Sequence, residues 1–151
     1  MLKQPSLVPL PAKNQYQLVG DYSVEIRDSL IVVPKYFRYD GASIPAAAWQ
    51  LTFSPFHPDV MLPALIHDWL FFNHQVEREE ADEIFYTLLR QNGVNSLRAN
   101  TMWAAVRLGG GLFWDNDAAD TAMLVELCQK VRQRAHFAQY QFPPAIVQQA
   151  D

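Results

Sequence analysis

The sequence predicts an α+β fold, with a small N-terminal antiparallel β-sheet followed by a cluster of about four helices. Two observations lead to this prediction. Apolar and polar residues alternate from Tyr22 to Arg27, which is the period of a half-buried strand. In the second half of the chain the apolar residues instead recur at intervals typical of helices. The 151 residues, 50% of them hydrophobic, suffice for a folded core without a disulfide or a structural metal.

The expected strands lie in the N-terminal third. Residues 16–19 and 22–27 are strand-like, and β-branched residues resume the pattern at residues 30–33, after a short polar break. Pro34 then places the end of the last strand at a sheet edge, because proline has no amide hydrogen to donate. This spacing predicts an antiparallel hairpin.

The expected helices follow, each with its own boundary signals. Pro63 suits a first turn, and Asn92 followed by Gly93 is a common C-cap pair. We expect helices over residues 61–72, 78–91 and 97–108, and from the acidic cluster at residues 115–117 to about residue 135.

The two ends are expected to differ from the single domain of residues 15–136. Residues 1–14 are predicted to form a Pro-rich extended arm, and residues 137–151 a C-terminal tail. Their apolar side chains must fold back on the domain or dock on a partner. We expect at least one end to make intermolecular contacts.

Charge and composition exclude several classes of protein. The net charge of −4 and the pI near 5.5 argue against broad nucleic-acid binding, which needs a basic face. No apolar run approaches the ~20 residues of a membrane span. No signal peptide is recognised, which favours synthesis in a cytoplasm.

Polar residues inside the apolar helical pattern are the candidate site. His67 and Asp68 interrupt the apolar segment 64–72, and Asp82 lies at the border of the next apolar stripe. We expect His67 and Asp82 to be buried and hydrogen-bonded, an arrangement suited to a general base acting on water. A structural bridge would look the same, and Arg107 is another candidate partner for Asp82.

A turn between the sheet and the helices, residues 39–45, is the second candidate. Asp40 and Ser43 would lie at the lip of a pocket, with Arg107 nearby, if this turn is functional. A plain connection between the sheet and the helices is the alternative.

These motifs resemble a known family. Residues 39–45, 64–72, 81–85 and 102–109 are similar, in order and spacing, to the phage and prophage family catalogued as domain of unknown function 1353. The resemblance covers residues 15–113 and implies a phage gene product. A fainter resemblance is to phospholipase A2, which implies His67 as the base, Asp68 as a calcium ligand and Asp82 as the orienting carboxylate. The Gly-rich calcium loop of that family is absent.

Two functions follow as expectations. The first is a phage virion component or assembly factor, most plausibly of the tail, made in the host cytoplasm and binding other phage proteins. The alternative is a small hydrolase in which His67 and Asp82 activate water. This alternative works with or without a divalent cation held by Asp68 and Asp40, and no other cofactor is indicated.

Overall fold

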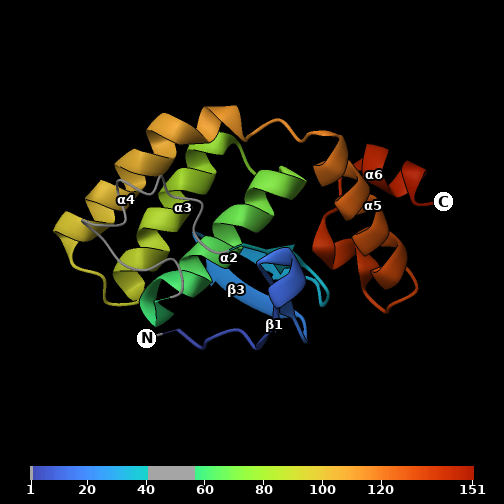
Figure 1. Cartoon of the computed structure of the whole chain (residues 1–151), viewed down its shortest axis with the longest axis horizontal. Coiled ribbons are helices and arrows are strands. Elements are labelled where there is room, and N and C mark those ends of the chain that lie inside the picture. Colours follow the sequence, from blue (N-terminus) through green and yellow to red (C-terminus); the bar gives the residue numbers. More distant parts are fainter. Residues whose placement is uncertain (1, 41–56) are drawn as a thin grey trace.

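The computed structural model describes residues 2–40 and 57–151. Its N-terminal part forms antiparallel strands and its remainder forms helices, so the predicted α+β class is confirmed (Figure 1). One sheet has the order β1-β2-β5, and β3 pairs with β4 in a separate hairpin. The strands are β1 (Leu7–Leu10), β2 (Gln15–Leu18), β3 (Tyr22–Ile26), β4 (Ser29–Val33) and β5 (Arg38–Tyr39).

The hairpin follows directly from the alternation in the sequence. Tyr22 pairs with Val33 and Ile26 with Ser29. The alternate side chains of β3 face the core, and the intervening ones face solvent. The connecting Arg27 and Asp28 both have positive φ, 49° and 62°, as a tight turn between twisted strands requires.

The helices form two groups. In the first, α3 packs against both α2 and α4, and in the second α5 packs against the short α6 (Figure 1). In the described ranges, 2–40 and 57–151, no helix is long and apolar enough to cross a membrane. The helices are α2 (Pro58–Asn73), α3 (Arg78–Gln91), α4 (Ser96–Gly109), α5 (Ala118–Val131) and α6 (Pro144–Gln149), with 3₁₀ turns η1 (Pro11–Lys13), η2 (Gly110–Leu112) and η3 (Phe137–Tyr140).

The start of α2 differs from the prediction. The helix begins at Pro58, capped by His57, so Pro63 lies inside it instead of in its first turn. Pro63 cannot donate to the carbonyl of Asp59, four residues earlier. The side-chain amide of Asn92, at the end of α3, donates to that carbonyl instead, at 3.1 Å. A partner from another helix therefore makes the internal proline tolerable.

Both ends of the described chain belong to the domain. β1 pairs with β2 across the expected boundary at residue 14, and Pro9 is tolerated because β1 is an edge strand. At the other end, Phe142 packs edge-on against Trp69 of α2, with ring centroids 5.6 Å apart. Tyr140 donates from its hydroxyl to Asp21 at 2.7 Å. The expected arm and tail thus fold back, because their apolar side chains find partners on the domain.

Candidate functional site

His67 and Asp82 meet in the core between α2 and α3. The Nε2 atom of His67 lies 2.8 Å from Oδ1 of Asp82. The Asp82 side chain has no solvent exposure, and His67 is 8% exposed. The contact expected from the sequence is therefore present, between residues placed on the facing sides of consecutive helices.

Asp82 is also held by two arginines. Nη1 of Arg78, one helical turn earlier on α3, lies 3.7 Å from Oδ2, and Nη1 of Arg107 on α4 lies 3.5 Å from the same oxygen. The sequence predicted His67 or Arg107 as the partner of Asp82, and in the structure both contact it. These cations compensate a carboxylate charge that would be costly to bury alone.

The hydrogen bond to Asp82 defines the roles of the two ring nitrogens of His67. A carboxylate only accepts, so Nε2 carries a hydrogen, and in the neutral imidazole Nδ1 then keeps its lone pair. Nδ1 has no hydrogen-bond partner among the described residues. It is also not one of the unpaired polar atoms that are buried away from solvent. The rings of Phe71 and Phe85 pack on the imidazole, with centroids 4.3 and 5.0 Å away. The ring is thus held in place with one basic nitrogen unused.

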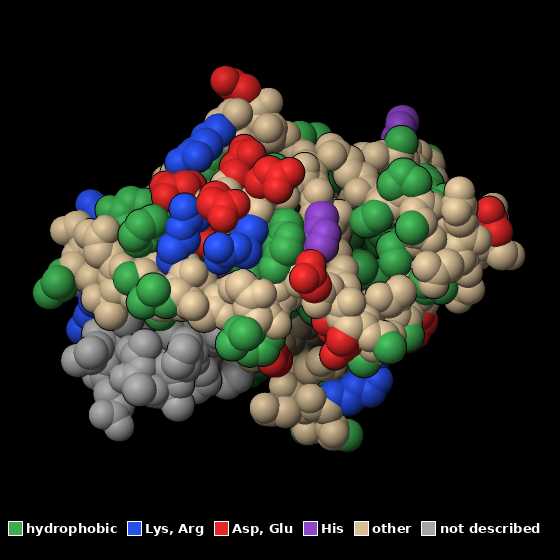
Figure 2. Space-filling model, turned by 90° about the horizontal axis from the view of Figure 1, so that it is seen from above, with side chains coloured by type: hydrophobic (Ala, Val, Ile, Leu, Met, Phe, Trp, Pro, Cys, Tyr) green, Lys and Arg blue, Asp and Glu red, His purple; other side chains and the backbone are tan. Residues whose placement is uncertain are grey.

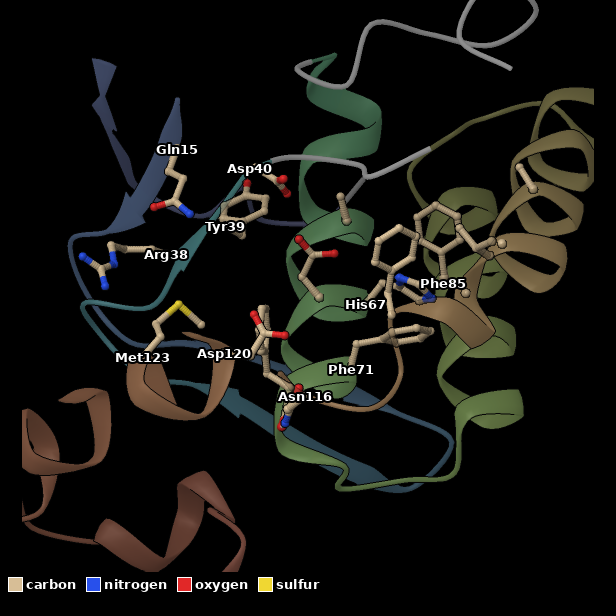
Figure 3. A pocket seen from close by; sticks show the side chains of 18 residues that line it. Gln15, Arg38, Tyr39, Asp40, His67, Phe71, Phe85, Asn116, Asp120 and Met123 are labelled. Atoms are coloured by element: carbon tan, nitrogen blue, oxygen red, sulfur yellow. The ribbon is translucent and has the colours of Figure 1, made fainter. Parts of the chain in front are cut away.

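A pocket of about 320 Å³ opens beside this pair (Figure 3). His67 and Asp68 of α2 line it, together with the end of β5, the end of α4 and the start of α5. Aromatic rings form much of its wall: Tyr39, Phe71, Phe72, Phe85 and Phe113. Its polar side chains besides His67 are Gln15, Arg38, Asp40, Asp68, Asn116 and Asp120.

Asp68 is the most perturbed acid of the pocket. Burial, and then the nearby Asp40 carboxylate, raise the pKa of Asp68 well above its ordinary value. The residue keeps intermediate exposure because it faces the pocket, although protein atoms surround it closely enough for desolvation to dominate. Burial and the negative charge of Asp68 also raise the pKa of the Tyr39 hydroxyl. Asp68 therefore holds its proton more tightly than a free aspartic acid does.

The expected metal site is not complete in the described part of the chain. Asp68 and Asp40, the metal ligands expected for a hydrolase, both line the pocket. Residues 2–40 and 57–151 contain no group of three or more His, Cys, Asp or Glu side chains able to hold a metal ion. Calcium usually takes roughly six to eight oxygen ligands. Two carboxylates alone do not fit it, and no chemical step is assigned to a metal.

The three residues expected at or near the pocket lip have different outcomes. Arg107 is not part of the described lining, because its guanidinium turns toward Asp82. Ser43 lies outside the described residues. Asp40, expected at the same lip, does line the pocket, where Figure 3 shows it beside Tyr39.

Some site residues escaped the sequence analysis. Arg78 precedes Asp82 by four residues, and the i, i+4 spacing on one helix could have identified it. Asn116, just before α5, and Asp120, in its first turn, also line the pocket, but in the sequence Asn116 is only part of the cluster that begins the helix. Nothing in the local pattern places them near His67.

A known protein family matches the part of the chain that contains most of this site. A family model described as "Protein of unknown function (DUF1353)" matches residues 16–106, from β2 through most of α4. That range includes His67, Asp68 and Asp82 but not the pocket residues of α5.

The chain is also similar to a curated protein. An uncharacterized protein of Sinorhizobium fredii, y4jT, is 31% identical over 96 residues, which are 63% of this chain and 29% of the relative. The chain thus spans less than a third of that relative's length. No solved structure matches the chain. Because the family model spans well over half of its length, the chain belongs to the DUF1353 family of proteins of unknown function.

Proposed function

We propose that this protein is a small hydrolase in which His67 and Asp82 activate a water molecule in the pocket. One observation carries the proposal. The imidazole that Asp82 holds at 2.8 Å also lines a pocket large enough for a small substrate, and its Nδ1 is unused within the described residues. A purely structural bridge requires no such pocket.

The chemistry follows from the two nitrogens of His67. Nδ1 accepts a proton from water as the water oxygen attacks the electrophilic centre of a bound ester or similar group. Asp82 stabilises the imidazolium that forms, and Arg78 and Arg107 compensate the Asp82 charge throughout. The imidazolium then returns the proton to the leaving group as its bond to the electrophilic centre breaks. Each turnover consumes one water and regenerates neutral His67.

The test is hydrolysis by the full chain of a panel of p-nitrophenyl esters, phosphates and glycosides. At least one compound should be hydrolysed, and His67→Ala should lower that rate by at least about a hundredfold, the usual contribution of a general base. The variant should remain folded, since Asp82 keeps both arginines, although Oδ1 of Asp82 loses its donor at a cost of about 1–3 kcal/mol.

The matched control addresses hydrolysis by surface imidazoles. His136 is exposed and lies outside the pocket lining, and its φ of 60° suits asparagine. His136→Asn should therefore hydrolyse the panel at the parental rate. Equal rates in the parent, His67→Ala and His136→Asn would contradict the proposal.

A role in phage assembly is a second candidate, supported by a different observation. Leu108, Leu112 and Phe113 are 88%, 86% and 67% exposed around the end of α4. Figure 2 shows hydrophobic side chains at the surface of one face of the molecule. Exposed apolar residues close together in the chain suit a protein partner, here another phage protein. Mass spectrometry of purified particles should then detect the chain, and its absence from them would remove this candidate.

A further inference from the structure

We propose that the pocket selects ligands carrying an ammonium group, held between the Asp68 carboxylate and the aromatic wall. The inference extends the proposed function, since it assigns the substrate of that hydrolysis to the class of organic cations. It depends on three features of the described pocket lining: the Asp68 carboxylate, the aromatic rings, and an arginine that is already paired with an acid.

Asp68 is a carboxylate in need of a partner. Within the described residues it forms neither a hydrogen bond nor an ion pair, and its neighbouring acid, Asp40, only repels it. Asp68 nevertheless lines the pocket, one position after His67 on α2. A crowded carboxylate facing a pocket is stabilised by a cation that enters it.

The positive charge that the pocket itself contains is already engaged. Arg38 is its arginine, and its Nη2 atom lies 3.5 Å from Oε2 of Glu126, which is not part of the described lining. Asp120 adds another carboxylate at the start of α5. The electrostatic balance inside the pocket therefore favours a cation.

The aromatic wall distinguishes an organic cation from a metal ion. The faces of Tyr39, Phe72 and Phe113 are electron-rich and attract ammonium groups. The same rings, phenylalanines for the most part, supply few of the oxygen ligands that a divalent metal requires. Aromatic faces combined with one carboxylate are the chemistry that recognises a substituted ammonium.

The test compares benzylamine with benzyl alcohol, two ligands of nearly equal shape, by calorimetry and NMR titration of the full chain at neutral pH. Benzylamine should bind at least about tenfold more tightly, since hydrogen bonds to charged groups are the stronger ones. Asp68→Asn, which keeps the side-chain shape, should abolish the difference. Glu25→Gln removes a carboxylate from the exposed face of β3 and should preserve it.

A second variant tests the proposal independently of Asp68. Phe113 is 67% exposed, so Phe113→Ala should fold normally. It should weaken benzylamine binding more than benzyl alcohol binding. His67→Ala should retain the preference for the amine, so that a failure of the hydrolase proposal and a failure of this one are distinguishable.

Three results would overturn the inference. The first is equal affinity for the two ligands, or no benzylamine binding at all. The second is a preference that survives Asp68→Asn in a folded protein. The third is saturable binding of Ca²⁺ that requires Asp68, without benzylamine binding, which would assign the carboxylate to a metal.

Discussion

Nη1 of Arg107 lies 3.5 Å from Oδ2 of Asp82, and in the described part of the chain neither atom has a hydrogen-bond partner although both are inaccessible to solvent. The two groups therefore interact as charges, without a directional bond. Since His67 approaches the other oxygen from α2, a single carboxylate on α3 links three helices. Asp82 therefore stabilises the packing of these helices and also belongs to the proposed site, so mutations are needed to distinguish the two roles.

Asp82→Ala and His67→Ala should separate them. Asp82→Ala leaves two guanidinium groups without their buried counter-charge and should lower the free energy of unfolding by about 3 kcal/mol. His67→Ala keeps the ion pairs to the arginines and should cost less, and under the proposed function it should lower the rate of hydrolysis by at least about a hundredfold. Urea denaturation and rate measurements on both variants check this. Equal losses of stability and of activity in the two would favour a structural role for the pair.

Asn92→Ala should lower the free energy of unfolding by about 1–3 kcal/mol, because the Asp59 carbonyl loses its donor. Pro63→Ala in that background should recover part of the loss, since residue 63 then has an N–H for the same carbonyl. A double-mutant cycle measures the coupling. Asn100→Ala is the control, because Asn100 bonds an exposed carbonyl on α4 and its loss should cost within about 0.5 kcal/mol. Additive effects of the Asn92 and Pro63 substitutions would contradict this account of the internal proline.

Asp68→Asn should stabilise the protein increasingly as pH rises. The pKa of Asp68 is raised from 3.8 on folding, so the folded state holds this proton more tightly than the unfolded state. The parent therefore loses stability as pH rises from about 3.8 through the folded pKa, and the variant does not. Chemical denaturation of both proteins across the acidic to neutral range measures the difference. Glu25→Gln controls for the removal of one negative charge, and a difference that shrinks with rising pH would contradict the prediction.

Gly110→Ala should impair the pocket where Gly111→Ala does not. A Cβ at Gly110 would lie 3.1 Å from the ring of Phe71, so that ring must shift. Phe71 packs against His67, so the shift should lower activity in the hydrolysis assay. A Cβ at Gly111 meets nothing within 4 Å. Equal activity in the two variants would show that the Phe71 ring adjusts without disturbing His67.

Deletion of residues 137–151 should strongly destabilise the domain. It exposes core previously covered by Tyr140, Phe142 and Ile146, each of which is buried and worth roughly 1.5–3 kcal/mol. It also removes the hydrogen bond from Tyr140 to Asp21. Thermal unfolding of the truncated and full chains checks this, and Phe142→Ala tests the contact with Trp69 alone. An unchanged melting temperature would mean that the tail is a separable docking segment, as an assembly role would require.

Local patterning determined much of the secondary structure. The boundaries predicted for α3, residues 78–91, coincide with the structure, because its apolar stripe and its cap are both local signals. In the β3–β4 hairpin, β3 follows from strict alternation and β4 from its run of β-branched residues. The start of α2 differs from the prediction because the helix contains an internal proline. Asn92, which is distant in the sequence, makes this proline acceptable by donating to the carbonyl of Asp59.

For the site, the sequence by itself determined which polar residues lie on or beside apolar faces, and so identified His67, Asp68 and Asp82. The sequence also predicted the contact between His67 and Asp82, but only the tertiary structure decided that both His67 and Arg107 reach this carboxylate. The orientation and separation of α2 and α3 put His67 against Asp82 and leave Asp68 facing the pocket. The same packing turns Arg107 inward and brings Asp120 of α5 to the pocket. Helical periodicity specifies the face on which a side chain lies, but the packing of helices specifies what that face contacts.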